Sequence, residues 1–334
     1  MSLAQTMTAA VVETRDGPFH LTDITRPTPG PGEVLVRVAA SGLNPLDLKI
    51  RAEQAAHARH PLPAVLGLDL AGEVEALGPG VQDFAKGQGV YGLVGGVGGL
   101  QGAQAQYVAV DARLLARRPR TLDARQAAAL PLVAITAWEG LVDRAQVKPG
   151  HSVLVQGGAG GVGHMAVQIA LAKGARVYAT ALGEEDLAYL RALGAVAIDG
   201  ARAVPDYLEE HTDGTGFEVV YDTGGGALLD ASFQAVRRFG HVVSCLGWGV
   251  HALAPLSFKQ ATYSGVFTLQ PLLSGEGRGH FGETLAAITD LVDQGLLEPR
   301  LHPGRFGLDA LAQAYEALAM RGKGKVVVDV GQAR

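Results

Sequence analysis

The arrangement of apolar and polar positions changes near residue 122. Before it, short runs alternate apolar and polar side chains and are separated by glycine- and proline-rich turns, as in Glu33–Ala40 and Gln88–Leu93. Such runs are typical of half-buried strands, and they predict a compact β-barrel over roughly the first 120 residues. After residue 122, apolar runs of strand length alternate with segments of helical periodicity. That alternation predicts a parallel sheet with helices on both faces, so the expected fold class is α/β.

The most informative stretch, Ser152–Thr180, contains a buried-strand pattern, a glycine cluster, an amphipathic helix and a second strand, in that order. Gly158, Gly160 and Gly163 have the spacing G-x-G-x-x-G. We expect the first glycine to allow the turn off the strand, the second to leave room for a pyrophosphate, and the third to let the helix pack on the strand. The helix would offer its N–H groups to the phosphates. The alternative is a glycine-rich turn without a ligand, but the flanking elements favour dinucleotide binding.

The end of the second strand indicates which dinucleotide is bound. NAD-binding folds usually carry an acid there, which holds the ribose 2′-hydroxyl. Here the strand ends Ala179-Thr180-Ala181, and the first acids are Glu184 and Glu185. The missing acid favours NADPH, because no carboxylate repels a 2′-phosphate. No basic residue stands at that loop either, so NADH remains possible.

Composition and charge exclude several classes of protein. The chain has 334 residues, of which 48% are apolar and 18% charged, with a net charge of −5. The densest basic stretch, 113–120, fits a solvated linker better than a nucleic-acid surface. The longest apolar run, 127–138, is too short to span a bilayer. No signal peptide precedes Met7, and the only cysteine is Cys245. We therefore expect a cytoplasmic protein without disulfides and without nucleic-acid or membrane partners.

Several motifs resemble the medium-chain dehydrogenase/reductase superfamily, in its zinc-free quinone-oxidoreductase-like branch. They are PGPGEVLVRVAASGLNPLDLKIR (29–51), AVLGLDLAGEVEALGPGV (64–81), AALPLVAITAWEGL (128–141), VLVQGGAGGVGHMAVQIA (153–170) and GKVVVDV (324–330). The resemblance implies a GroES-like barrel domain formed by residues 1–124 and 270–334. It also implies a Rossmann cofactor domain at 125–269, with the active site in the cleft between the two.

The same resemblance bears on metal binding. Zinc-dependent relatives place a cysteine where this chain has Asn44, and a His-Glu pair where it has Leu68-Asp69. A catalytic zinc needs three protein ligands at one point, and the ten histidines show no such spacing. We interpret His57 and His60 as surface residues. We therefore expect no zinc, which favours a quinone or enone acceptor over an alcohol, because an alkoxide would lack a Lewis acid.

The resemblance further implies a set of cofactor-binding residues. Two departures from it concern the 2′-phosphate: Gly183-Glu184-Glu185 stands where relatives often have a lysine or arginine, and Asp199-Gly200 stands where they often have a tyrosine. Asn44 could also be a turn starter before Pro45, and Thr136 could cap its own helix. The implied cofactor-binding residues are Asn44, Thr136, Gly158, Ala159, Gly160, Gly161, Val162, Gly163, Thr180, Ala181, Asp222, Thr223, Leu246, Gly247 and Lys325.

Candidate catalytic side chains are few. By resemblance, Asn44, Asp47 and Lys49 lie on the segment that faces the nicotinamide, and Lys49 could stabilise an oxyanion or relay a proton. The alternative is that Asp47 and Lys49 pair to hold a turn. Cys245, in an apolar run, fits an inert buried thiol better than a nucleophile. Trp248 is either a pocket wall or a core residue.

These observations predict a zinc-independent, NADPH-dependent reductase of quinones or activated alkenes. The alternatives are a zinc-free alcohol dehydrogenase and a dinucleotide-binding protein without turnover. We also expect a homodimer, because Gly265–Leu269 has the composition of an apolar edge strand that could pair with its twin. The alternative is that this segment is an internal strand covered by the helix that follows.

Overall fold

A computed structural model describes residues 5–320 and 323–331. Its contacts divide the chain into two compact units. Unit 1 comprises Met1–Leu132, Leu269–Gly295 and Pro299–Arg334, and unit 2 comprises Val133–Thr268 and Leu296–Glu298. The first boundary falls after the expected residue 124, because the short helix that follows it packs on strands of unit 1.

Unit 1 is rich in short strands, as the alternating pattern predicts. Its strands are β1 (Thr6–Val12), β2 (Phe19–Thr25), β3 (Glu33–Gly42), β4 (Ala64–Val65), β5 (Asp69–Leu77), β6 (Gly89–Leu93), β7 (Tyr107–Asp111), β8 (Leu115–Arg117), β15 (Phe306–Gly307) and β16 (Val327–Asp329). Its helices are α1 (Pro45–Arg51), η1 (Ala56–Ala58), η2 (Ala112–Leu114), α2 (Ala124–Ala128), α9 (Gln270–Ser274), α10 (Arg278–Asp293), η4 (Leu308–Ala310) and α11 (Leu311–Ala319).

The strands of unit 1 form two sheets. The smaller has the order β2–β1–β4, and the larger has the order β15–β16–β3–β5–β6–β8, with β7 also paired to β3. Strand β16, from the far end of the sequence, runs antiparallel to β3 and places Val328 opposite Ser41. Both ends of the chain therefore contribute to one sheet, as the family resemblance implies.

Two local features hold the helices of unit 1 in place. Asp123 caps α2, because its side chain accepts a hydrogen bond of 2.8 Å from the N–H of Gln126. The hydroxyl of Tyr91, buried on β6, donates 2.6 Å to the carbonyl of Leu285 on α10. A buried tyrosine hydroxyl needs such a partner, and this one fixes the helix on the sheet.

Unit 2 alternates strands and helices. Its strands are β9 (Ser152–Gln156), β10 (Arg176–Ala181), β11 (Val196–Asp199), β12 (Phe217–Asp222), β13 (Val236–Ser244) and β14 (Thr262–Gly265). Its helices are α4 (Gly161–Ala172), α5 (Glu184–Ala192), α6 (Val204–Thr212), α7 (Ala227–Ala235) and α8 (Ala254–Lys259). Helix α3 (Pro131–Trp138) enters the unit and continues as the π-helical turn η3 (Glu139–Arg144).

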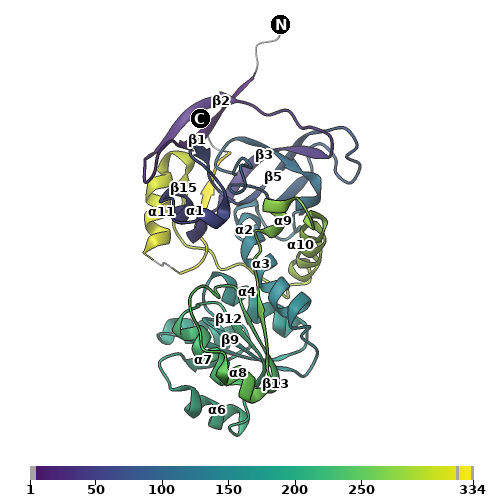
Figure 1. Cartoon of the computed structure of the whole chain (residues 1–334). Coiled ribbons are helices and arrows are strands. Elements are labelled where there is room, and N and C mark those ends of the chain that lie inside the picture. Colours follow the sequence, from purple (N-terminus) through teal and green to yellow (C-terminus); the bar gives the residue numbers. More distant parts are fainter. Residues whose placement is uncertain (1–4, 321–322, 332–334) are drawn as a thin grey trace. The chain divides into compact units, whose positions relative to one another are not determined.

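All six strands of unit 2 are parallel, in the order β11–β10–β9–β12–β13–β14. This order reverses direction beside β9, which is the topological switch point of a Rossmann fold. In Figure 1 the helices α4, α7 and α8 lie around these strands. Apolar side chains such as Leu154, Phe217 and Phe233 form a buried core between strands and helices. The predicted α/β class is confirmed.

Two predicted elements of unit 2 differ from the structure. The periodicity of residues 227–239 predicts a helix over that whole range, but α7 ends at Ala235, and strand β13 begins at Val236, which is buried and pairs with Phe217. The strand expected over Gly265–Leu269 is also misplaced, because β14 ends at Gly265. Its residues pair with β13 only as far as Ser244, where β13 itself ends. Burial of the Val236 side chain decides the first of these boundaries, and the length of the neighbouring strand β13 decides the second.

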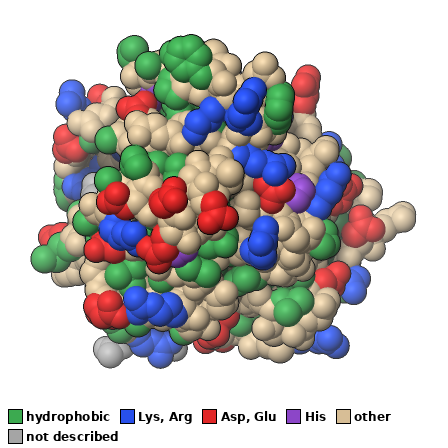
Figure 2. Space-filling view, turned by 90° about the horizontal axis from the view of Figure 1, so that it is seen from below, with side chains coloured by type: hydrophobic (Ala, Val, Ile, Leu, Met, Phe, Trp, Pro, Cys, Tyr) green, Lys and Arg blue, Asp and Glu red, His purple; other side chains and the backbone are tan. Residues whose placement is uncertain are grey.

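The surface agrees with the modest net charge. Figure 2 shows acidic and basic side chains interspersed on one face, without a large area of a single sign. Among residues 5–320 and 323–331, no helix combines the length and apolarity needed to cross a bilayer.

Candidate active site

The glycine cluster forms the turn from β9 into α4. Gly157 has a φ of 74°, so the left-handed turn lies one residue before the glycine that we expected to provide it. A Cβ on Gly158 would instead lie 2.7 Å from the Cβ of Ala179 on β10. A Cβ on Gly163 would overlap the carbonyl oxygen of Gly157, which confirms that this glycine lets the helix approach the strand. The role expected for Gly158 is thus corrected to close packing.

The middle glycine is exposed. The nearest atom to a Cβ on Gly160 is the Gly157 carbonyl oxygen at 3.3 Å. Gly160 is also the N-cap of α4, and no side chain caps this helix end. The first-turn N–H groups, from Gly161 to Gly163, have no carbonyl partners within the helix, and the dipole makes this end positive. These features fit the pyrophosphate of a nicotinamide dinucleotide.

Thr180 supports this turn from the neighbouring strand. Its side chain is almost fully buried, and its hydroxyl accepts a 3.0 Å hydrogen bond from the N–H of Gly157. The same hydroxyl donates 2.8 Å to the side chain of Gln156. The predicted cofactor residue Thr180 therefore positions the turn, and adjacent Ala181 is buried at the end of β10. Gln156 was missed, although a polar residue that ends a buried strand is a recognisable signal.

Asp222 organises the ends of β12 and β13. It is fully buried, and its carboxylate accepts hydrogen bonds from the N–H groups of Gly224 (3.1 Å) and Gly225 (3.0 Å). Ser244 donates 2.6 Å to the other carboxylate oxygen and accepts 3.0 Å from the N–H of Leu246. This network places Leu246 and the exposed Gly247 at the edge of the sheet where open α/β folds bind ligands. The sequence predicted a cofactor-binding role for Asp222, which stays a prediction, and gave no prediction for Ser244.

The predicted cofactor residues Thr136 and Thr223 are held by hydrogen bonds within unit 2. The Thr136 hydroxyl lies 2.9 Å from that of Thr268, and the Thr136 carbonyl accepts 2.7 Å from the hydroxyl of Tyr221. Thr136 lies within α3, so it does not cap that helix. The Thr223 hydroxyl donates 2.7 Å to the carbonyl of Gln156.

Unit 1 holds a buried polar cluster around Asn44. The Asn44 side chain donates 2.9 Å to Asp69 and accepts 2.5 Å from the ammonium of Lys325. That ammonium also donates 3.0 Å to the carbonyl of Leu43 and lies 3.4 Å from the Asp69 carboxylate. Burial raises the pKa of Asp69, although the charge of Lys325 and the hydrogen bond from Asn44 oppose this. The structure therefore brings together Asn44 and Lys325, which are far apart in sequence.

Asp47 and Lys49 have different environments. Asp47 is fully buried at the start of α1, and its carboxylate accepts 2.8 Å from the N–H of Asn44. Burial raises the pKa of Asp47 to about 7, and repulsion from Asp69 adds to this. The Asn44 N–H, the charge of Lys325 and the Tyr315 hydroxyl oppose the shift. Lys49 is exposed, so the pair of Asp47 and Lys49 considered as an alternative does not hold this turn.

The position of the zinc site of the metal-dependent relatives is filled differently. Leu68 is fully buried, and the Asp69 carboxylate accepts a hydrogen bond from Asn44 and forms an ion pair with Lys325. In the part of the chain that the structure describes, no group of three or more His, Cys, Asp or Glu side chains is arranged to hold a metal ion. The absence of zinc stays a prediction.

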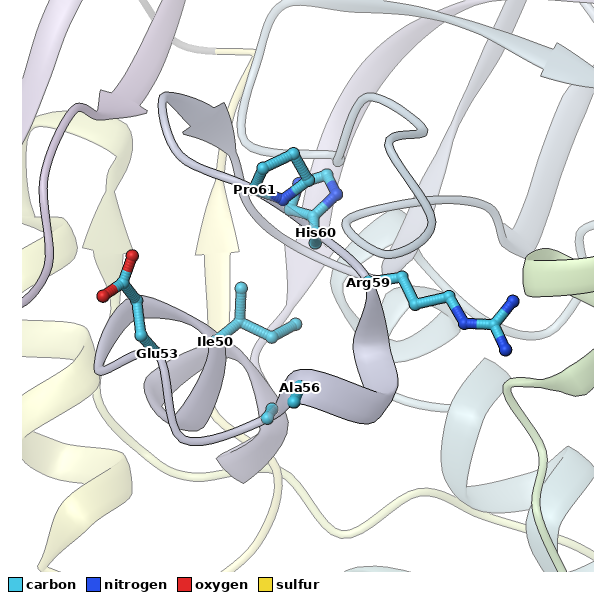
Figure 3. A pocket seen from close by; sticks show the side chains of 7 residues that line it. Ile50, Glu53, Ala56, Arg59, His60 and Pro61 are labelled. Carbon is cyan, nitrogen blue, oxygen red and sulfur yellow. The ribbon is translucent and has the colours of Figure 1, made fainter.

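A cavity of about 370 Å³ lies beside α1 and η1 in unit 1. Figure 3 shows Ile50 between Glu53 and Arg59, with His60 beside Pro61 at another side. The expectation that His60 is a surface residue needs correction, because its two ring nitrogens are shielded from solvent. Burial lowers the pKa of His60, which favours the neutral imidazole. The spacing of His57 and His60 in the sequence did not indicate that His60 would line this cavity.

The structure also distinguishes between the alternatives given above for Cys245 and Trp248, which follow the end of β13. Burial raises the pKa of Cys245 to about 12, so this thiol is a poor nucleophile, as expected. Trp248 is 56% exposed, and its ring meets that of Phe267 edge to face at 6.2 Å. Trp248 is therefore a surface aromatic residue and does not belong to the core of unit 2.

Comparison with known proteins agrees with this architecture. Residues 30–120 match the alcohol dehydrogenase GroES-like domain, and residues 161–289 match the zinc-binding dehydrogenase family. The chain is 34% identical over 304 residues to the chloroplastic NADPH-dependent alkenal/one oxidoreductase of Arabidopsis thaliana, covering 89% of this chain and 72% of that protein.

Two solved structures extend the comparison to the fold. An alcohol dehydrogenase superfamily protein from Novosphingobium aromaticivorans is 62% identical, with a TM-score of 0.96 and coverage of 97% of this chain and 100% of that one. The quinone oxidoreductase from Coxiella burnetii is 28% identical, with a TM-score of 0.81 and coverage of 98% and 100%. The predicted combination of a GroES-like and a Rossmann domain is confirmed.

Proposed function

Because the chain belongs to the medium-chain dehydrogenase/reductase superfamily, we propose that it is an NADPH-dependent reductase of quinones or activated alkenes. The observation that carries this proposal is the open helix end at Gly160. There a buried strand, a close-packed glycine turn and the uncapped start of α4 together suit a pyrophosphate. The similar oxidoreductase of Arabidopsis thaliana, named for NADPH and alkenal/one substrates, supports the choice of cofactor and acceptor.

The Asn44 cluster supports the choice of acceptor. An amide at position 44 and an alkyl side chain at 68 cannot act as the thiolate and imidazole ligands of a catalytic zinc. Asn44 is instead held by Asp69 and Lys325. An acceptor that delocalises its own negative charge, such as a quinone or an enone, suits such a site better than an alcohol or its alkoxide.

NADPH, when bound, would supply the hydride that adds to the electrophilic carbon of the acceptor. The α4 turn would hold the pyrophosphate, while Thr180 and Asp222 keep the surrounding turns in place. Asp47 is fully buried, and Lys49 is exposed. We therefore assign the proton that completes the reduction to water, and we assign Asn44 and Lys325 to positioning.

We also propose a cytoplasmic homodimer. Strand β14 is the last strand of its sheet, and Thr262 and Tyr263 are exposed on it. An uncovered edge strand offers backbone groups to a second copy, and a two-fold axis would satisfy both edges at once. The single cysteine is consistent with a reducing compartment.

The proposed function is tested by following NADPH oxidation with a panel of quinones, enones, aldehydes and alcohols. We expect turnover with quinones or enones, no change on adding a chelator, and no stoichiometric zinc by elemental analysis. Turnover confined to alcohols and aldehydes would favour the zinc-free alcohol dehydrogenase. Tight NADPH binding without turnover of any acceptor would favour a non-catalytic binding protein.

A further inference from the structure

NADPH differs from NADH only by a phosphate on the ribose next to adenine. In a Rossmann sheet that ribose lies at the carboxyl end of the second strand, here β10. The chain after β10 reads Leu182-Gly183-Glu184, and three acids occupy the first turn of α5. If the proposed function is correct, a cation that binds the 2′-phosphate has to come from a neighbouring segment.

The loop after β11 is the neighbouring segment that contacts this point. The N–H of Gly200 donates 2.8 Å to the carbonyl of Ala181, the last residue of β10. The Asp199 side chain then closes the turn by accepting 3.0 Å from the N–H of Ala201. The N–H of Arg202 donates 3.1 Å to the Asp199 carbonyl. The backbone of Arg202 is thus held two residues after Gly200, the residue that is hydrogen-bonded to the end of β10.

The Arg202 side chain is available for exchange. Its guanidinium lies 2.7 Å from the carboxylate of Glu210 on α6, and the two side chains are 36% and 54% exposed. Ion pairs this exposed contribute little, because water solvates both partners. A phosphate offers a guanidinium a stronger, bidentate partner than a single exposed carboxylate.

Other arginines of unit 2 are less suitable. Arg176 is the first residue of β10, and Arg237 stands near the start of β13, so both belong to the opposite end of these parallel strands. Arg191 is bound at 2.5 Å to Glu184, within the acidic first turn of α5. Bringing a phosphate to Arg191 would place it beside like charges.

We propose that Arg202 exchanges Glu210 for the 2′-phosphate of NADPH and is the residue that selects NADPH over NADH. The missing basic residue after β10 is then replaced by an arginine from the loop after β11. Glu210 competes for the same guanidinium in the absence of cofactor.

The test is a fluorescence titration of NADPH and NADH into wild type, Arg202→Ala, Glu210→Gln and the control Arg191→Ala. We expect Arg202→Ala to raise the Kd for NADPH about tenfold or more, as loss of a charge-assisted contact should, with the Kd for NADH changed less than about twofold. Glu210→Gln should leave NADPH binding as tight or tighter. Arg191→Ala should affect both cofactors alike.

Three results from the variants would overturn the assignment. They are equal effects of Arg202→Ala on both cofactors, no effect on either, or a selective loss of NADPH affinity in Arg191→Ala. A wild type that binds NADH but not NADPH would also overturn it while leaving dinucleotide binding intact. A wild type that binds neither cofactor would overturn the proposed function together with this inference.

Discussion

The carboxylate of Asp69 and the ammonium of Lys325 lie 3.4 Å apart in the interior of unit 1, where the two side chains are 0% and 6% exposed. Asp69 begins β5, and Lys325 lies just before β16. Asn44 bridges the two by donating to one and accepting from the other. Charges buried to this degree are stable only while both partners are present.

Lys325→Met should therefore destabilise the protein strongly. Removing one partner leaves a buried charge, which typically costs about 3–5 kcal/mol of unfolding free energy. The double variant Asp69→Asn, Lys325→Met removes both charges and should recover much of that loss. Chemical denaturation of the two variants and the wild type measures this, and equal stability of the single and double variants would show that the pair is not coupled.

Asp47 makes the stability depend on pH. Its pKa is about 7 in the folded protein, above the ordinary value of 3.8, so the native state holds a proton that the unfolded chain has released. The free energy of unfolding should therefore be highest below pH 4 as far as this group is concerned, and should fall as the pH rises to 7. The fall amounts to about 4 kcal/mol for that pKa difference. Asp47→Asn, which stays neutral, should flatten this part of the profile. An unchanged slope in the variant would refute the assignment to Asp47.

The functions of Gly160 and Gly163 in the glycine turn can be separated by mutation. Gly160→Val should fold with nearly normal stability and lose dinucleotide binding, because its side chain would occupy the open space beside the α4 end. Gly163→Ala should lose stability instead, because its Cβ would overlap the Gly157 carbonyl. Thermal denaturation and cofactor titration of both variants distinguish the effects. Unchanged NADPH affinity in Gly160→Val would mean that the pyrophosphate binds elsewhere.

The proposed dimer interface can be tested by mutation in β14. The N–H of Val266 donates to the Ser244 carbonyl on β13, so by alternation the N–H of Gly265 points away from β13. A Cβ at Gly265 would meet no atom closer than 3.9 Å. Gly265→Pro should remove an outward donor and give monomers, while the control Gly265→Ala should stay dimeric. Sedimentation at micromolar concentration decides this, and a monomeric wild type would reject β14 as the seam.

The sequence was sufficient to predict an element where a motif of known chemistry coincides with the hydrophobic pattern of the elements beside it. The glycine spacing between two apolar runs located the turn at Gly160 and Gly163, and the family motifs located Asn44 and Lys325. It was insufficient where the outcome depends on partners distant in the chain. Only folding brings Asp69 and Lys325 together as an ion pair. The same holds for the hydrogen bond that ties the loop of Arg202 to Ala181. The end of β14 is likewise set by the length of β13, which local residues do not encode.

Tracing the hydride itself tests the account most directly. The protein, dialysed against a chelator, would be mixed with an enone and NADPH that carries deuterium at the transferable position of the nicotinamide. We predict a product with one deuterium at the β-carbon and a solvent-derived proton at the α-carbon, identified by mass spectrometry and NMR. NADPH oxidation that leaves no deuterium in the organic product, or reduction that appears only after zinc is restored, would contradict a zinc-independent hydride transfer.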